Sequence, residues 1–392
     1  AEHIALKKKL HLAFYSYKDS IMQIAVPSES LPSERRVALI PDAAKKLVRA
    51  GLDVHIESGA GLRSGYADAD YEAVGVHIQN DQTALLASAD LVLRVRKPSL
   101  DDVAKLKSGA IHVSYLDPYN EAGLVDALAA ANITAISMEM IPRTTRAQKM
   151  DALSSQANLA GYVMVILAAQ QLDRILPMMM TPAGTLSPAR VFVIGAGVAG
   201  LQAIATAKRL GARVEAFDTR AVVAEQVQSL GAKFIEIDLG ETGQTKDGYA
   251  NALTPEQLEL QRLGMKDVIS QADIVITTAQ LFGRPAPRII TADMVAAMKP
   301  GGVIVDMAVD SGGNVEGSEP DQTVDVNGVS IIGMANLPAQ VCKDASQMYS
   351  SNLVNLVSEY WDGETKHFNL DMEDDILQGC VITHGLSLIH IS

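Results

Sequence analysis

The fold is decided by residues 195–220, which read GAGVAGLQAIATAKRLGARVEAFDTR. This stretch opens with a GxGxxG motif, and the apolar run 191–194 precedes it. A helical pattern follows the motif, and a second apolar run then ends at Asp218, about 20 residues beyond the first glycine. The hexapeptide alone is weak evidence, but the order strand, glycine turn, helix, strand and carboxylate predicts a dinucleotide-binding unit.

Each residue type in this turn has a physical task. Gly195 permits the tight turn, Gly197 lets backbone N–H groups approach a pyrophosphate, and Gly200 lets the helix pack against the sheet. Asp218 is expected to accept hydrogen bonds from the adenosine ribose and to repel a 2′-phosphate, which favours NAD(H), although Arg220 lies close enough to complicate that choice. The predicted cofactor-binding residues are Gly195, Gly197, Val198, Ala199, Gly200, Asp218, Thr219, Arg220, Thr278 and Ala279.

Short apolar runs alternate with amphipathic stretches on both sides of the motif, which predicts an α/β protein. We expect two Rossmann-like, doubly wound parallel-sheet domains, and the helical stretch 339–360 is expected to return to the first, making it discontinuous. A long helix over residues 143–172 should bridge them. The expected strands are 23–26, 53–56, 91–95, 111–115 and 133–138 in the first domain, and 191–194, 213–217, 233–237, 273–277, 302–306 and 330–333 in the second.

The predicted domain boundaries follow from these patterns. Residues 22–145 and 336–383 form the first domain, and residues 146–335 form the NAD(H)-binding domain. Residues 1–21 resemble no signal peptide, and we interpret them as a non-native leader. The final residues 386–392, LSLIHIS, are interpreted as an artefactual tail.

Composition excludes several classes of protein. The net charge of −13 disfavours binding to nucleic acid or to anionic lipid. Two cysteines, Cys342 and Cys380, are too few for a disulfide framework or a cysteine-rich zinc site. No stretch reads as a membrane span, so no direct membrane insertion is expected.

Four stretches together are similar to the NAD(H)-binding component of proton-translocating NAD(P) transhydrogenase. They are residues 195–220, quoted above, 143–162 (RTTRAQKMDALSSQANLAGY), 34–41 (ERRVALIP) and 306–314 (DMAVDSGGN). The resemblance implies direct hydride transfer between NAD(H) on this chain and NADP(H) on a partner component, coupled to proton translocation. It also implies homodimers, a membrane-spanning proton-channel component as a further partner, and a cytoplasmic, peripheral place on the inner face of a bacterial inner membrane.

By the same resemblance, Arg143, Gln148, Asp151 and Ser154 supply the nicotinamide side of the site. The spacing of the last three would place them on one helical face. The polar segment 238–263 is similar to the family's mobile loop, and Tyr249 matches the loop tyrosine. Such a loop would exclude water during transfer.

Two other functions stay open. The first is an alanine dehydrogenase-like oxidoreductase, whose family has a lysine and a histidine where this chain has Arg96 and Asp117; Lys97 is one position away, and Arg36 and Asp310 match further dehydrogenase residues. Because arginine cannot act as a base, transhydrogenase is the favoured interpretation. The second is a non-catalytic NAD-binding module, which the departure from the family pattern at residues 280–282 keeps open.

Overall fold

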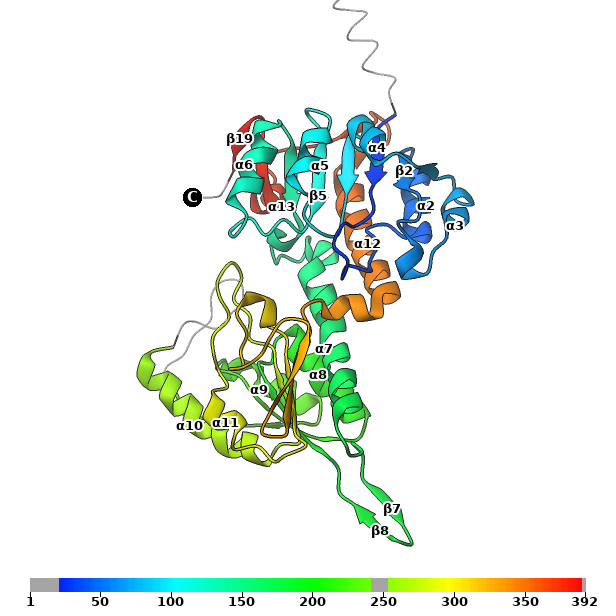
Figure 1. The fold of residues 1–392 in the computed structure, drawn as a ribbon. Coiled ribbons are helices and arrows are strands. Elements are labelled where there is room, and N and C mark those ends of the chain that lie inside the picture. The colour runs from blue at the N-terminus through cyan, green and yellow to red at the C-terminus, as the bar shows by residue number, and fades with distance from the viewer. Residues whose placement is uncertain (1–20, 241–252, 390–392) are drawn as a thin grey trace, which may run out of the picture. The chain divides into compact units, whose positions relative to one another are not determined.

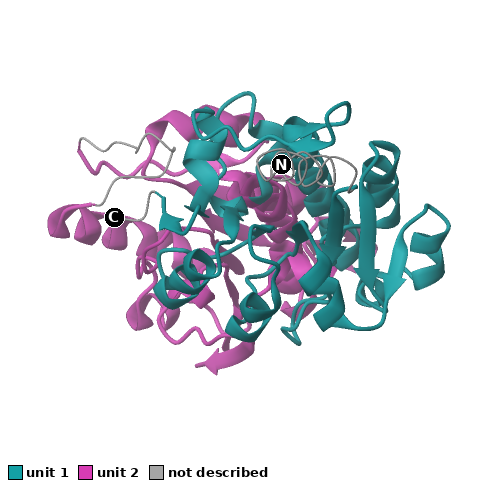
Figure 2. Cartoon of the chain, turned by 90° about the horizontal axis from the view of Figure 1, so that it is seen from above, with its two compact units in different colours: residues 1–152, 342–392 teal, residues 153–341 magenta. Residues whose placement is uncertain are grey.

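A computed structural model describes residues 21–240 and 253–389, which divide into two compact units. Unit 1 contains the chain up to Ala152 and again from Cys342 onward, and unit 2 is Leu153–Val341 (Figures 1 and 2). The chain therefore leaves unit 1 and later returns to it, as the sequence predicts. Each unit is described separately below.

Unit 1 contains an eight-stranded sheet in the order β19-β18-β6-β5-β4-β1-β2-β3. The pairings among β1 to β6 are parallel, whereas β18 is antiparallel to β6 and β19 is antiparallel to β18. The five predicted strands all form, while β3, β18 and β19 were not predicted. The strands are β1 (Gln23–Val26), β2 (Asp53–Glu57), β3 (His77–Gln79), β4 (Leu91–Leu93), β5 (Ile111–Ser114), β6 (Thr134–Ser137), β18 (Val381–His384) and β19 (Ser387–Leu388).

The helix α12 (Cys342–Tyr360) carries the chain back into unit 1. Two serine hydroxyl groups of α12 accept hydrogen bonds from backbone N–H groups in the loop before α2 (Pro41–Arg49). The N–H of Val37 donates to Ser346 Oγ at 3.0 Å, and the N–H of Ile40 donates to Ser350 Oγ at 3.0 Å. Satisfied buried N–H groups fix α12 against this loop. The other helices and small strands are α3 (Asp68–Glu72), α4 (Gln82–Ser88), α5 (Leu100–Lys105), α6 (Ala122–Ala130), α13 (Asp375–Cys380), the 3₁₀ turns η1 (Leu62–Ser64), η2 (Met138–Met140) and η3 (Gln148–Met150), and the pair β16 (Trp361–Asp362) and β17 (His367–Phe368).

Unit 2 contains a seven-stranded sheet in the order β11-β10-β9-β12-β13-β15-β14. Its first six strands are parallel and have the order of a complete dinucleotide-binding fold, as predicted. An antiparallel strand, β14, and an exposed hairpin of β7 and β8 were not predicted. The strands are β7 (Met179–Thr181), β8 (Gly184–Leu186), β9 (Arg190–Ile194), β10 (Arg213–Phe217), β11 (Lys233–Phe234), β12 (Ile274–Thr277), β13 (Val303–Asp306), β14 (Gln322–Val326) and β15 (Val329–Gly333).

Helices complete unit 2, and two of them differ from expectation. The long helix α7 begins at Ala152 rather than near residue 143. The predicted loop 238–263 is partly helical, because Thr254 caps α10 and accepts the N–H of Gln257 at 3.3 Å. The helices are α7 (Ala152–Gln171), α8 (Val198–Arg209), α9 (Ala224–Ser229), α10 (Pro255–Gln271) and α11 (Ala292–Val295), with the 3₁₀ turns η4 (Ala221–Val223), η5 (Val309–Ser311) and η6 (Leu337–Val341).

One helix meets the length and composition criteria of a membrane span. Within the described residues, α7 is long and apolar enough to cross a membrane, although a single such helix is weak evidence. Several of its side chains, including Val163, Met164 and Ala168, are buried in the same apolar cluster as strand β9. Packing inside unit 2 therefore accounts for its apolar composition.

Helices α7 and α8 approach each other closely at Gly161. A Cβ atom added there would lie 2.2 Å from the carbonyl oxygen of Ala199, well inside a van der Waals contact. Glycine normally weakens a helix interior, so its use here reflects this close approach.

We expect Gly161→Ala to lower the free energy of unfolding by about 1–3 kcal/mol, because the helices must move apart. Gly123→Ala in α6 is the matched control, since no atom lies within 4 Å of its added Cβ. That variant should be neutral or slightly stabilised. Urea unfolding of both variants measures the difference, and equal stabilities would contradict the packing explanation.

Candidate dinucleotide-binding site

The glycine turn between β9 and α8 is sterically closed to side chains at two points. Gly195 has φ +94°, and a Cβ there would lie 2.5 Å from Thr278 Oγ1. A Cβ at Gly200 would lie 1.8 Å from the carbonyl oxygen of Gly195. Gly197, the residue before the first turn of α8, instead meets nothing within 4 Å. The N-terminus of α8 is thus open on the side of Gly197, where its N–H groups and helix dipole favour a bound phosphate.

The turn lies where the connections of the sheet diverge. Strand β9 pairs with β10 on one side and with β12 on the other. In open α/β sheets, ligands bind beyond the carboxyl ends of strands at this position. Thr278 follows β12, and its hydroxyl donates to the carbonyl oxygen of Gly195 at 3.0 Å. The next predicted residue, Ala279, also lies beside the turn: its backbone nitrogen would be 3.5 Å from a Cβ added at Gly195.

Asn314 fixes the backbone at Ala279 from a third segment. Its Oδ1 accepts the Ala279 N–H at 3.1 Å, and its Nδ2 donates to the Ala279 carbonyl at 2.8 Å. Asn314 is itself held by Asp306, whose buried carboxylate accepts the N–H groups of Asn314 at 3.0 Å and Ala308 at 2.9 Å. Sequence reasoning used the 306–314 motif only as a resemblance and missed these positioning roles. The sequence signal for these roles was a carboxylate at the end of an apolar strand, Asp306, followed by the glycine pair at 312–313.

Asp218 directly follows β10 and holds the glycine turn from a second side. Its Oδ2 accepts the N–H of Ala196 at 2.7 Å. Its two oxygens also accept Nε and Nη2 of Arg220, each at 2.9 Å. These hydrogen bonds raise the pKa of Arg220 above its usual value, so its charge is retained. Thr219 lies between them in the chain, so the predicted ribose-binding residues form one bracket with the glycine turn.

The predicted nicotinamide-side residues do not share a helical face. Gln148 lies in the 3₁₀ turn η3, Asp151 has an extended backbone with ψ 91°, and Ser154 lies in the first turn of α7. The extended residue breaks the helical register that the spacing of three assumes. Arg143 precedes these elements and is exposed, and Tyr249 lies outside the described residues.

Unit 1 holds the segment around η3 in place. The side chains of Asn352 and Asn355 on α12 both donate to the Lys149 carbonyl at 3.0 Å. Lys149 Nζ also pairs with Glu359 at 2.7 Å, and Arg146 pairs with Asp374. Two of the predicted nicotinamide-side residues, Gln148 and Asp151, therefore lie in or directly after a turn with defined anchors.

A buried ion cluster in unit 1 involves the residues that distinguish the rival functions. Arg36 is paired with Glu34 through Nε at 2.8 Å and Nη2 at 2.6 Å. Arg96 Nε also contacts Glu34, at 2.8 Å. Burial raises the pKa of Glu34, but hydrogen bonding and charge from Arg36, together with the charge of Arg96, outweigh it and lower that pKa to about 2. The carboxylate of Glu34 is thus paired with both arginines.

Lys97 does not take the place of Arg96. Its Nζ lies 2.5 Å from Glu121 and 3.6 Å from Asp117, and its side chain is 40% exposed. Asp117 in turn accepts a hydrogen bond from Asn120 at 2.8 Å. Lys97 therefore pairs with Asp117 and Glu121 and is not part of the Glu34 ion cluster that contains Arg96.

Comparisons with known proteins agree with this geometry. Residues 25–160 match the family model "Alanine dehydrogenase/PNT, N-terminal domain", and residues 164–390 match "Alanine dehydrogenase/PNT, C-terminal domain". The chain belongs to the alanine dehydrogenase/PNT family. Within this family it is 45% identical to the first part of NAD(P) transhydrogenase subunit alpha of Rhodospirillum rubrum, over 94% of this chain and 98% of that protein.

The chain can also be compared with a solved transhydrogenase and with an alanine dehydrogenase of the same family. The crystal structure of transhydrogenase from Sinorhizobium meliloti superposes with a TM-score of 0.85 at 44% identity, covering 94% of this chain and all of that chain. Alanine dehydrogenase of Halomonas elongata is 33% identical, over 83% of this chain and 84% of that protein. The predicted transhydrogenase resemblance and α/β fold class are confirmed, and the alanine dehydrogenases are more distant. The family match also supports NAD(H) as the cofactor of unit 2.

The ion cluster predicts a specific acid dependence of stability. The pKa of Glu34 is about 2 in the folded chain, below its ordinary value of 4.5, so its stabilising contribution is present above about pH 4.5 and is lost as the pH falls toward 2. Between about pH 6 and pH 3.5, the free energy of unfolding of the unmodified chain should fall by roughly 1 kcal/mol more than that of Glu34→Gln. Urea titrations measure this difference in slope.

Glu364→Gln, at an exposed carboxylate, is the control and should follow the unmodified chain. Glu34→Gln should also be less stable at neutral pH, because Arg36 loses its buried partner. Identical pH slopes for all three proteins would contradict the assigned ion cluster.

Proposed function

We propose that the chain is the NAD(H)-binding component of a proton-translocating NAD(P) transhydrogenase. It transfers hydride directly between NAD(H) and NADP(H) held by a partner component, and this transfer is coupled to proton movement across a membrane. The observation that carries the choice is the pairing of Arg36 and Arg96 with Glu34. A carboxylate of the chain itself is paired with Arg36, the residue that matches the substrate-carboxylate arginine of the dehydrogenases, and Arg96 cannot serve as a base.

Direct hydride transfer between two nicotinamide rings needs neither a catalytic base nor an arginine for a substrate carboxylate. The C4–H bond of one dihydronicotinamide breaks, and the hydrogen moves with both electrons to C4 of the other ring, so no proton has to be donated or accepted. Catalysis then consists of holding two rings at near-attack distance. We assign this positioning to Arg143, Gln148, Asp151 and Ser154, with Tyr249 contributing from segment 238–263. An arginine, an amide, a carboxylate and a hydroxyl can orient a carboxamide and a ribose by hydrogen bonding.

The partners follow from the same proposal. They are a membrane-spanning proton-channel component and the NADP(H)-binding component, and the chain itself would be peripheral on the cytoplasmic face of a bacterial inner membrane. A homodimer is supported by the hairpin of β7 and β8, which projects beyond the rest of unit 2 (Figure 1). Met178, Met180 and Leu186 on or beside it are 54–73% exposed. Clustered apolar side chains on a projecting hairpin are typical of a protein interface.

The decisive assay measures reduction of an oxidised NAD analogue by NADPH. It is run with and without a recombinant NADP(H)-binding component, and a parallel reaction offers NADH with pyruvate and ammonia. We expect transfer only with the partner and no reaction with pyruvate and ammonia. Oxidation of NADH by pyruvate and ammonia would instead assign an amino-acid dehydrogenase. NAD binding without transfer to any acceptor would favour a non-catalytic module.

Coenzyme choice provides a separate prediction about the Asp218 bracket. Asp218→Ala should weaken NAD binding by at least about tenfold, because the ribose loses its acceptor and the Ala196 N–H loses its partner. The same change releases Arg220, whose guanidinium then suits a 2′-phosphate, so the preference for NAD over NADP should shrink. Fluorescence titration with both reduced coenzymes measures the two affinities.

A double variant tests whether Arg220 causes the change in coenzyme preference. Adding Arg220→Ala should abolish any gain in NADP(H) affinity, and Asp218→Asn should be intermediate because it keeps one acceptor oxygen. Unchanged affinities for both coenzymes in Asp218→Ala would rule out the ribose assignment.

A further inference from the structure

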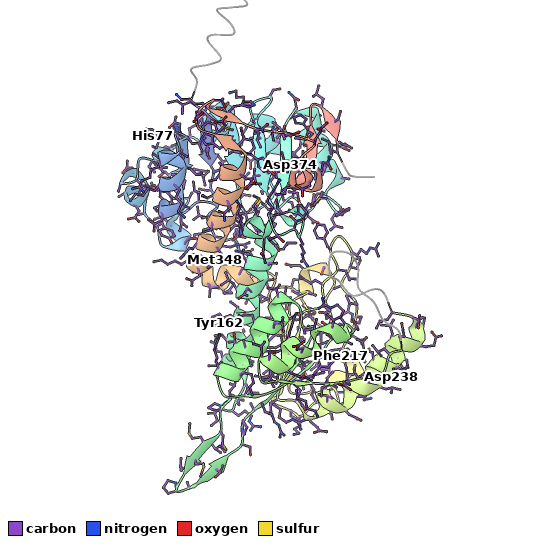
Figure 3. The ribbon with its side chains drawn as sticks, turned by 180° about the vertical axis from the view of Figure 1, so that it is seen from behind. His77, Tyr162, Phe217, Asp238, Met348 and Asp374 are labelled. Atoms are coloured by element: carbon purple, nitrogen blue, oxygen red, sulfur yellow. The ribbon has the colours of Figure 1, made fainter. Side chains whose placement is uncertain are left out.

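An aspartate and two histidines converge at the edge of the unit 1 sheet, remote in sequence from every residue assigned above. Asp53 and His55 lie on β2, and His77 begins β3, the last strand of that sheet. One ligand atom from each of the three side chains lies within 4.8 Å of the others. Figure 3 labels His77 on the outer part of unit 1.

Strand geometry explains why these side chains meet. Residues two apart on a strand point to the same face, which places Asp53 beside His55, whereas Val54 and Ile56 are buried. The parallel pairing of β2 with β3 puts His77 directly opposite His55. The two imidazole rings consequently lie 4.8 Å apart between centroids, tilted by 37°.

Two of the three separations between donor atoms are close to those of a metal site. Asp53 Oδ2 lies 2.9 Å from His55 Nε2, and Asp53 Oδ1 lies 3.4 Å from His77 Nε2. Ligands bound about 2.0–2.2 Å from a tetrahedral Zn²⁺ stand about 3.3–3.6 Å from one another. Small side-chain adjustments therefore suffice for one ion to bind all three residues.

The surroundings also suit a cation. Both histidines line one surface pocket, so solvent reaches them. Nδ1 of His55 is buried and has no hydrogen-bond partner among the described residues. Asp53 is the one described residue that hydrogen-bonds to this ring, through Nε2, so a cation bound to Nε2 and to the carboxylate would replace that single contact.

We propose that Asp53, His55 and His77 form a Zn²⁺ site that ties the edge strand β3 to β2. Two imidazoles and one carboxylate are a donor set that Zn²⁺ favours, and water completes the coordination. An edge strand of three residues has a neighbour on one side only, so a metal bridge would stabilise its pairing. This inference is independent of the proposed hydride transfer.

The test uses the full, tag-free chain after removal of metals with a chelator. Calorimetric titration with Zn²⁺ should show one equivalent bound in the unmodified chain. His77→Gln should weaken that binding by at least about tenfold, since one of three protein ligands is lost. His77 is exposed, so the variant is expected to fold. His367→Gln removes another exposed histidine, on β17, and should bind as the unmodified chain does.

Two further measurements separate the site from other effects. Co²⁺ in place of Zn²⁺ should give a visible absorption band that His77→Gln and Asp53→Asn both lose. Zn²⁺ should raise the Tm of the unmodified chain by a few degrees but not that of His77→Gln. Affinity for NADH should be the same in His77→Gln and the unmodified chain. Equal Zn²⁺ binding by all variants, or no binding by the unmodified chain, would overturn the proposal.

Discussion

The carbonyl oxygen of Gly195 lies where a side chain at position 200 would begin, 1.8 Å from an added Cβ. This approach forces α8 to start directly behind β9, with its first N–H groups at the strand's carboxyl end. One residue earlier in the same helix, the Ala199 carbonyl lies where a side chain at Gly161 would begin, and α7 packs closely against α8. The missing side chains thus position both the phosphate turn and the helix packed beside it.

Two strand-ending carboxylates hold the loops around that turn. Asp218 accepts the Ala196 N–H after β10, and Asp306 accepts the N–H groups of Ala308 and Asn314 after β13. Both use charge to satisfy backbone donors that a tight loop leaves without a partner. Asn314 extends the second bracket to the backbone beyond β12. Rigid loops at these ends keep the N-terminus of α8 presented to a diphosphate, since little order has to be created on binding.

Sequence patterns predicted most of the sheet because buried parallel strands are continuous apolar runs and glycine turns separate them. The same patterns missed the antiparallel strand β14 and the hairpin of β7 and β8, whose residues are largely exposed and carry no such signal. The helical face assumed for Gln148, Asp151 and Ser154 failed because one extended residue, Asp151, resets the register. Single backbone torsions of this kind depend on neighbours such as α12, which are distant in sequence.

The Arg36 cluster shows why a shared motif need not mean a shared substrate. Burying a guanidinium without a partner is costly, and so is burying Glu34, but together with Arg96 they compensate each other. Losing one member would leave the other charged and desolvated, so packing alone is a sufficient reason for both to be present. Arginine in ERRVALIP is therefore compatible with a chain that binds no small carboxylate. In this chain Arg36 contacts a carboxylate of its own unit, Glu34.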